Sequence, residues 1–131
     1  MRIIRRNPET NNYDIDITAG EWKDILRLPA VQHAPNLLVA LEKWYKAPAQ
    51  TSSCKQLARQ YGLTHQFFSI QNVRLGRLAV RHLARFRLVG ANGRETYWPV
   101  AWLELSEHHG EYTMQLRPEL VEAIRQLGIF D

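Results

Sequence analysis

The sequence contains only one cysteine, Cys54, and no long hydrophobic run. A single cysteine cannot form an internal disulfide, but a chain of 131 residues buries about two-thirds of its unfolded surface on folding, enough for a hydrophobic core. Apolar stretches such as residues 99–103 are far shorter than the roughly 20 residues that cross a membrane. The basic N-terminus lacks the apolar stretch of a signal peptide. These absences predict one cytoplasmic domain with no membrane association.

Acidic residues are missing from the middle of the chain. Residues 43–94 contain ten Lys and Arg but no Asp or Glu. The rest of the chain holds the other seven basic residues and all thirteen acidic ones, so the net charge of +4 hides a strongly basic block. Helical surfaces usually mix charges of both signs, because like charges repel. Ten cations without counter-ions therefore predict an external polyanion, and nucleic acid is the common one.

The N-terminal part of the chain is predicted as an extended arm followed by a short helix. Residues 1–17 form this arm, with a short strand at 13–17. Thr18 and Glu21 have the spacing of a capping box, in which each residue bonds the backbone of the other. Pro29 ends the helix that this box opens.

Helical periodicity continues between Pro35 and Pro48 and then through two segments joined by a short turn. The first segment begins at the hydroxyl-rich residues 51–53 and ends at Gly62. Thr64 caps the second, which Gly76 is expected to bend or divide. Two helices joined by so short a glycine-containing turn form a helix-turn-helix.

After Phe86 the spacing of apolar residues changes from that of a helix to that of a strand. Asn92-Gly93 predicts a hairpin between residues 87–90 and 95–98, because both residues accept positive φ. A second hairpin is expected over 97–116, turning at 106–110, and Pro118 opens a final helix. The predicted fold is α+β, a winged helix-turn-helix over residues 18–131 with an extra N-terminal helix, a small antiparallel sheet and a C-terminal helix.

The predicted helix-turn-helix coincides with the basic block, which suggests contact with double-stranded DNA. In this motif the N-terminal residues of the second helix reach base edges in the major groove. The hydrogen-bonding side chains there are Thr64, His65, Gln66, Ser69, Gln71 and Asn72. Candidate phosphate contacts lie at a helix N-terminus and along one helical stripe. They are Thr51, Ser52, Ser53, Lys55, Arg74, Arg77, Arg81 and Arg85.

Two further groups of residues are assigned to the first predicted hairpin and the strands after it. Arg87, Asn92 and Arg94 surround the turn and would form a wing. The aromatic residues of the strands are expected to form a cross-strand core. Any of Tyr97, Trp98 and Trp102 that is exposed beside the basic surface could stack on a base, including one rotated out of the duplex.

Enzymatic sites have weaker support in the sequence. It has no Ser-His-Asp, Walker or dinucleotide-binding pattern, and His108-His109 with one cysteine lacks zinc spacing. We therefore expect no cofactor, no metal and no enzymatic activity. Asp14, Asp16 and Glu21-Trp22-Lys23 match the bare string of a metal-dependent nuclease, but they open a helix where that site needs a strand.

Two other interpretations of the residues stay open at this point. Cys54 lies beside a helix N-terminus, which could lower its pKa, although a half-buried helix residue is the ordinary interpretation. The basic face could also dock an acidic protein partner, with Trp98 or Trp102 as the interface anchor. The chain would then be a protein-interaction module.

Five segments, in order, resemble a known family. They are LEKWYKAP at 41–48, QLARQYG at 56–62, NVRLGRLA at 72–79, YWPV at 97–100 and LRPELVEAI at 116–124. Over residues 34–127 the chain resembles an N-terminal domain of bacterial modification-dependent restriction proteins, which precedes an HNH nuclease or an AAA-type motor. The resemblance implies recognition of DNA, including modified DNA, for a nuclease or motor domain in the same chain or in a partner protein. It carries no catalytic motif.

Overall fold

A computed structural model describes the backbone of residues 1–108 and 111–131. It describes the side chains of residues 1–105 and 111–131. The protein is mixed α+β. Its helices are α1 (Ala19–Leu26), α2 (Pro29–Gln32), α3 (Pro35–Lys46), α4 (Cys54–Tyr61), α5 (His65–Leu83) and α6 (Pro118–Leu127), with 3-10 turns η1 (Pro48–Gln50) and η2 (Trp98–Val100). Its strands are β1 (Arg2–Arg5), β2 (Thr51–Ser52), β3 (Phe86–Val89), β4 (Trp102–His108) and β5 (Glu111–Leu116).

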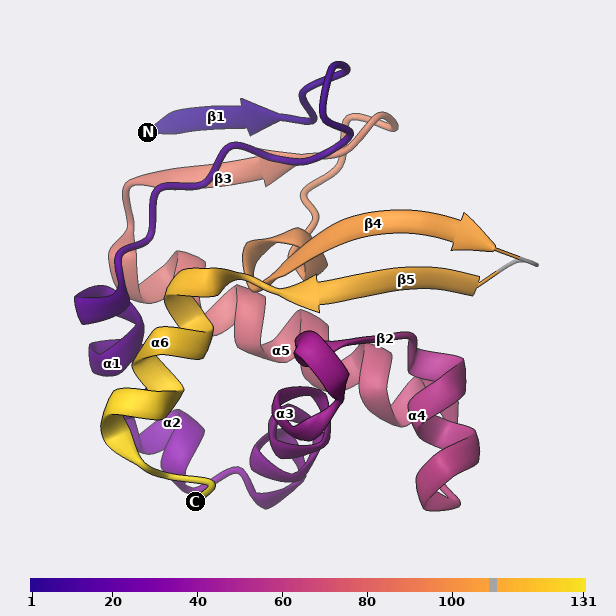
Figure 1. Ribbon diagram of the computed structural model, residues 1–131. Coiled ribbons are helices and arrows are strands. Elements are labelled where there is room, and N and C mark those ends of the chain that lie inside the picture. Colours follow the sequence, from indigo (N-terminus) through magenta and orange to yellow (C-terminus); the bar gives the residue numbers. More distant parts are fainter. Residues whose placement is uncertain (109–110) are drawn as a thin grey trace.

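Helix α5 runs across the middle of the molecule, with α1, α2 and α6 gathered at one end and α4 at the other (Figure 1). Several of its apolar residues, including Phe68 and Leu75, are fully buried. Trp44 of α3 meets Trp102 of β4 edge to face, with ring centroids 5.8 Å apart. The core therefore joins the helices to the sheet. No helix within the described residues is long and apolar enough to cross a membrane.

The predicted helix boundaries are confirmed where a local cap sets them. Thr18 and Glu21 form both hydrogen bonds of the capping box at the start of α1. Gly62 ends α4 in the left-handed conformation, with φ 67°. The Thr64 hydroxyl accepts from the Phe67 amide at 3.1 Å and so caps α5. Each of these signals acts within four residues of the chain, which is why the sequence alone is sufficient to place them.

The first predicted hairpin forms only in part. The Asn92-Gly93 turn is present, but the return segment makes one isolated bridge, from Val89 to Glu95, and then enters η2. Pro99 lies in η2, where its missing backbone N–H leaves no strand hydrogen bond unmade. The second hairpin forms as β4 and β5, and β2 pairs with the other edge of β5, giving the strand order β2-β5-β4. Its expected turn includes residues 109–110, which lie outside the described residues.

The N-terminal arm contains a strand, but not where the sequence predicts it. Strand β1 pairs in parallel with β3, from Arg2 beside Phe86 to Arg5 beside Val89. Residues 13–17 form no strand, although Tyr13 and Ile17 are buried in the core. The pairing joins segments more than 80 residues apart in the chain. Local alternation of side chains cannot reveal such a partner.

One charged side chain, Arg117, is buried at the junction of the arm and η2. Its guanidinium donates to the Pro99 carbonyl at 2.9 and 3.1 Å and to the Tyr13 carbonyl at 2.9 Å. Burial lowers the pKa of Arg117 to about 10, so it remains charged at neutral pH. These bonds satisfy backbone acceptors that would otherwise be buried without donors.

Gly76 neither bends nor divides α5, which is continuous from His65 to Leu83. Instead, it lets the backbone of η2 approach the helix. A Cβ atom at Gly76 would lie 2.0 Å from the Tyr97 carbonyl oxygen and 2.8 Å from the carbonyl carbon. Because the obstacle is backbone, a side chain here must move the whole segment.

We expect Gly76→Ala to lower the free energy of unfolding by about 3 kcal/mol, because overpacking against backbone forces a shift of η2. Urea unfolding followed by circular dichroism measures the change. Gly20→Ala is the matched control, since the nearest atom to a Cβ there is 3.9 Å away. That variant should gain about 0.5 kcal/mol from the higher helix propensity of alanine. Equal stability of the two variants would contradict this account of Gly76.

Candidate nucleic-acid interface

Helices α4 and α5 pack against each other around a short turn. The Ser53 hydroxyl accepts from the Gln56 amide at 3.0 Å and caps α4. After Gly62, the Leu63 amide donates to the Ala58 carbonyl at 3.0 Å, so α4 ends tightly. Leu57 and Phe68, one from each helix, are buried in the common core. Two packed helices joined by a short turn are thus found where the sequence predicts them.

The first turns of α5 and the nearby part of α4 present exposed side chains that are mostly polar. Shallow depressions, neighbouring ones of which share Lys55 or Ser69 in their linings, run from the N-terminus of α5 to its middle. We call this surface the α4–α5 face, made of the exposed residues Lys55, Thr64, His65, Gln66, Ser69, Ile70 and Arg74. Of these, the Thr64 hydroxyl is engaged as a cap.

Two predicted base contacts are not on this surface. Gln71 and Asn72 are only 7% and 2% exposed. They follow Phe68 by three and four residues, which places them on the buried stripe of α5. Their assignment as base-edge contacts is wrong, because neither side chain can reach a groove from this stripe. Their spacing from the apolar Phe68 in the sequence already indicates that both side chains lie on the buried side of the helix.

The hydroxyl cluster at 51–53 is also turned away from solvent. Ser52 and Ser53 are buried, and Ser53 donates to the Glu111 carboxylate at 3.0 Å. The Thr51 hydroxyl donates to the Ala49 carbonyl at 2.9 Å. The prediction that these hydroxyls bind phosphate is wrong for Ser52 and Ser53, because Ser52 is buried where β2 pairs with β5, and Ser53 is buried as the cap of α4 and bonds Glu111.

The arginine stripe on α5 divides into residues with different partners. Arg74 and Arg81 are exposed and make no ion pair with any described residue. The Arg77 guanidinium lies over the Tyr97 ring, 5.0 Å from its centroid. Arg85, at the end of the helix, is bound within the protein. Periodicity alone places these residues on one stripe but does not show which are engaged.

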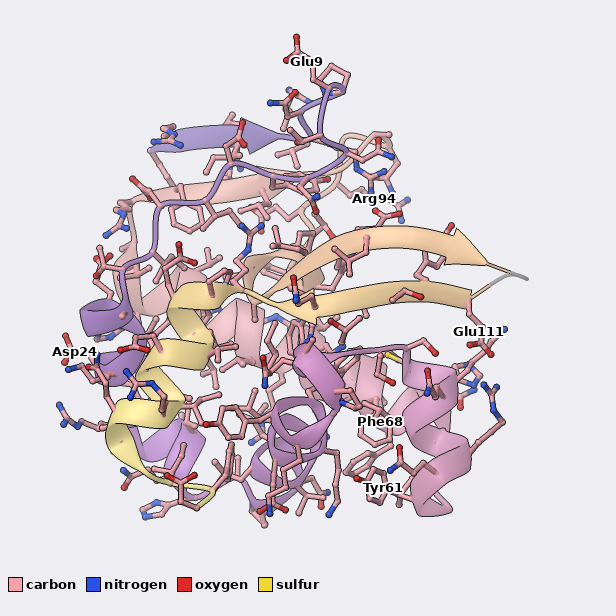
Figure 2. The ribbon with its side chains drawn as sticks, in the orientation of Figure 1. Glu9, Asp24, Tyr61, Phe68, Arg94 and Glu111 are labelled. Atoms are coloured by element: carbon pink, nitrogen blue, oxygen red, sulfur yellow. The ribbon has the colours of Figure 1, made fainter. Side chains whose placement is uncertain are left out.

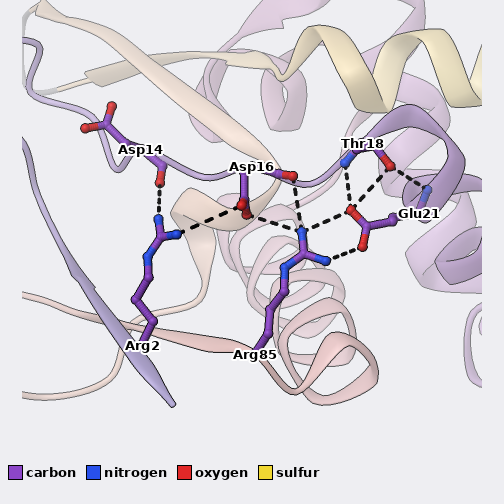
Figure 3. A network of polar contacts seen from close by, with 6 residues as sticks. All are labelled: Arg2, Asp14, Asp16, Thr18, Glu21 and Arg85. Atoms are coloured by element: carbon purple, nitrogen blue, oxygen red, sulfur yellow. Dashed lines mark hydrogen bonds and ion pairs between the residues drawn. The ribbon is translucent and has the colours of Figure 1, made fainter.

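Arg85 is the centre of a polar network that joins the end of α5 to the arm and α1 (Figure 3). It forms a two-pronged ion pair with Glu21 and also contacts Asp16, with nitrogen to oxygen distances of 3.0 and 3.2 Å from Nη2. Arg2 reaches the same Asp16 at 3.9 Å. The Arg85 guanidinium and the Thr18 amide together lower the pKa of Glu21 to about 2. Arg85 is thus engaged by acidic residues of its own chain, and its assignment as a phosphate contact stays a prediction.

The prediction that the basic block lacks counter-ions is wrong for half of its ten cations. Acidic residues from elsewhere in the sequence fold back on them or flank them. Figure 2 shows Glu111 directed from the hairpin toward α4, where it pairs with Arg59 at 2.7 Å. This contact lowers the pKa of Glu111. The other paired cations are Lys43, Lys46, Arg85 and Arg87.

The predicted wing lies at the Asn92-Gly93 turn, next to the arm rather than next to α4 (Figure 1). The Asn92 side chain accepts from the Arg94 amide at 2.9 Å and stabilises the turn. Arg87 pairs with Glu95 at 3.4 Å, whereas Arg94 is exposed. The turn chemistry is as the sequence indicates, but the segment is not part of the α4–α5 face.

The aromatic candidates for base stacking are also separated by the fold. Trp102 is 1% exposed, so its assignment as a stacking residue is wrong. Tyr97 is half-buried, and its phenol donates to Glu95 at 2.6 Å, which raises the pKa of Tyr97. Trp98 is half-buried and lines a cavity under the hairpin. Neither Tyr97 nor Trp98 lies on a strand as predicted.

The residues of the nuclease-like string have structural roles. Glu21 caps α1 and pairs with Arg85, and Asp16 shares that arginine. Among the described residues, no three His, Cys, Asp or Glu side chains are grouped so as to hold a metal. The suggestion of a lowered cysteine pKa is wrong, because burial raises the pKa of Cys54 to about 11.

Ile70, which no sequence pattern singled out, is 60% exposed in the middle of the α4–α5 face. An exposed branched side chain between Ser69 and Arg74 can contact a thymine methyl group or an apolar patch of a protein. Its signal was its position one residue outside the buried stripe of α5.

The chain matches no protein-family model, no curated protein and no solved structure.

We expect Glu21→Gln to lower the free energy of unfolding by about 1 kcal/mol at neutral pH, because a partly exposed ion pair is screened by solvent. The folded pKa of Glu21 is depressed from 4.5 to about 2. Its stabilisation is therefore complete above the unfolded pKa and is lost as the pH falls toward 2.

The difference between wild type and Glu21→Gln should shrink over that range, as measured by urea unfolding at about pH 7, 4 and 2.5. Glu9→Gln serves as control, since Glu9 is exposed on the arm and makes no ion pair with a described residue. A difference that persists unchanged at the lowest pH would contradict the ion pair as its cause.

We expect Cys54 to react slowly with alkylating reagents in the folded protein. Burial raises its pKa from 9.0 to about 11, which leaves about a hundredfold fewer thiolates at pH 8. Iodoacetamide labelling followed by mass spectrometry measures the rate, and the same protein unfolded in urea is the control. Because Cys54 is the sole cysteine, no other thiol contributes. Equal rates in both states would show that the thiol is neither buried nor shifted.

Proposed function

We propose that the protein is a DNA-binding recognition module without enzymatic activity. The observation that carries this proposal is the α4–α5 face itself. It combines the exposed N-terminal turn of α5, which presents His65 and Gln66, with the cations Lys55 and Arg74, which pair with no described acid. Phosphate contacts from the cations would supply affinity, and the side chains of the first turn would reach base edges.

The connectivity around this face supports a winged helix-turn-helix. Helix α3 leads through β2 into α4 and α5, and the hairpin β4–β5 follows later in the chain. The short strand β2 pairs with β5 in the order β2-β5-β4. A winged helix has this order of helix, strand, two helices and hairpin. The wing in this proposal is the β4–β5 hairpin, which lies beside α4 (Figure 1), and not the turn at 92–93.

A role in a restriction or defence system, with recognition of modified DNA, is the more specific part of the proposal. It rests on the resemblance of residues 34–127 to the N-terminal domains of modification-dependent restriction proteins. The effector would be a nuclease or motor, in the same full-length chain or in a partner protein. A cytoplasmic location accompanies this role.

The proposal predicts binding to a labelled duplex that weakens steeply with salt. Each phosphate contact adds about 0.9 to the slope of log affinity against log salt. Lys55→Ala combined with Arg74→Ala should lower that slope by about two and weaken binding to all sequences alike. Arg27→Ala combined with Arg125→Ala is the matched control, since it removes the same charge from α6 and the end of α1. The control should retain the wild-type slope.

Two further comparisons decide the finer parts of the proposal. Gln66→Ala should change the preference between sequences more than the general affinity, and methylated or hydroxymethylated duplexes should differ from unmodified ones. No binding at about 50 mM salt would overturn DNA binding. Binding to an acidic protein alone would instead support the interaction module, for which the exposed side chain of Ile70 is the favourable observation.

A further inference from the structure

A cavity of about 490 Å³ lies between the β4–β5 hairpin, the start of α4 and the middle of α5. Its size is in the range of small-molecule sites in proteins. The residues that matter for the argument are Lys55, Asn72, Trp98, Glu104, Tyr112 and Met114. They come from helices, both hairpin strands and η2, so only the folded chain assembles this cavity.

The cavity is lined by two residues with buried acceptors that are not fully satisfied. Asn72 is 2% exposed, its Nδ2 donates to the Cys54 sulfur at 3.7 Å, and its Oδ1 has no partner. Glu104 Oε2 is buried and forms an ion pair with the Arg6 guanidinium at 3.3 Å, but it accepts no well-aligned hydrogen bond. A buried acceptor without a donor is unfavourable and calls for an explanation. Both atoms would be satisfied by a ligand that brings N–H groups.

The remaining walls of the cavity favour a flat aromatic ligand. Trp98 offers an indole ring and Met114 a polarisable thioether, both suited to the face of a ring. Tyr112, which is 54% exposed, stands where solvent can enter. Lys55 lines the cavity and also belongs to the α4–α5 face. The cavity therefore borders the proposed DNA-binding surface.

We propose that this cavity binds a single nucleobase that carries an exocyclic amino group, with its N–H groups donating to Asn72 and Glu104 and its ring against Trp98. Adenine, cytosine and guanine have such a group, whereas thymine does not. On DNA, which rests on the proposed function, the base would be one turned out of the duplex. Extrusion is cheapest for a base that is already unpaired.

Duplexes with one unpaired base test this site directly. We would measure binding to matched duplexes that carry an unpaired adenine, cytosine, guanine or thymine, a bulged abasic residue or no bulge. The duplexes with an unpaired amino base should bind about tenfold more tightly than the fully paired one, the gain expected from stacking one base. The abasic and thymine bulges should gain less. Equal affinity for all six duplexes would overturn the site while leaving DNA binding intact.

Variants separate the cavity from general effects on the fold. Asn72→Leu should abolish the preference for amino bases with little loss of stability, because it removes a buried oxygen that lacks a partner and only one long contact, from Nδ2 to the Cys54 sulfur. Gln71→Leu is the matched control, since Gln71 is the neighbouring buried amide with an unpaired oxygen but does not line the cavity. It should keep the preference. Glu104→Gln is a second cavity variant and should weaken the preference while changing the fold little.

Titration with free nucleosides distinguishes the two sources of a base. Saturable binding of adenosine, cytidine or guanosine that Asn72→Leu abolishes would support the cavity even if no duplex binds, and the proposed DNA function would then fail alone. Nucleoside binding that Asn72→Leu leaves unchanged would overturn the assigned site. Absence of binding by every nucleoside and every bulged duplex would also overturn it, whatever the affinity for paired DNA.

Discussion

The buried guanidinium of Arg117 connects parts of the chain that share no secondary structure. It bonds the carbonyls of Tyr13 in the arm and Pro99 in η2, and its own amide donates to the Ala101 carbonyl at 2.9 Å. Removing it would leave buried carbonyl oxygens without donors, which costs more than the bonds themselves are worth. The backbone next to η2 also packs closely against Gly76 of α5. The Arg117 side chain therefore helps to fix the arm, the sheet and the central helix relative to one another.

Charge in this protein is arranged by the fold as much as by the sequence. The acidic residues outside the basic block return to it, with Glu21 and Asp16 at Arg85 and Glu111 at Arg59. The cations that pair with no described acid include two on the α4–α5 face. The surface proposed to bind a polyanion is thus smaller than the composition suggests, and it lies at the first turns of α5.

The proposed base site and the proposed DNA surface rest on different physical arguments. The surface depends on exposed charge, whose attraction to phosphate is long-ranged and weakened by salt. The cavity depends on the buried acceptors of Asn72 and Glu104, which interact only at hydrogen-bond distance. Asn72 was assigned to DNA recognition for its amide and proved to be buried. Its burial removes it from the groove but gives its amide oxygen a role inside the cavity.

The sequence by itself determined the features that depend on neighbours within one or two helical turns. These are the capping box at Thr18, the Gly62 stop, the Thr64 cap and hence the short turn between α4 and α5. The tertiary structure alone decided which strands pair, which arginines are engaged and which polar residues are buried. The parallel pairing of β1 with β3 and the ion pairs of Arg85 join segments more than 60 residues apart. Such contacts depend on the packing of the whole core, which no local pattern of residues encodes.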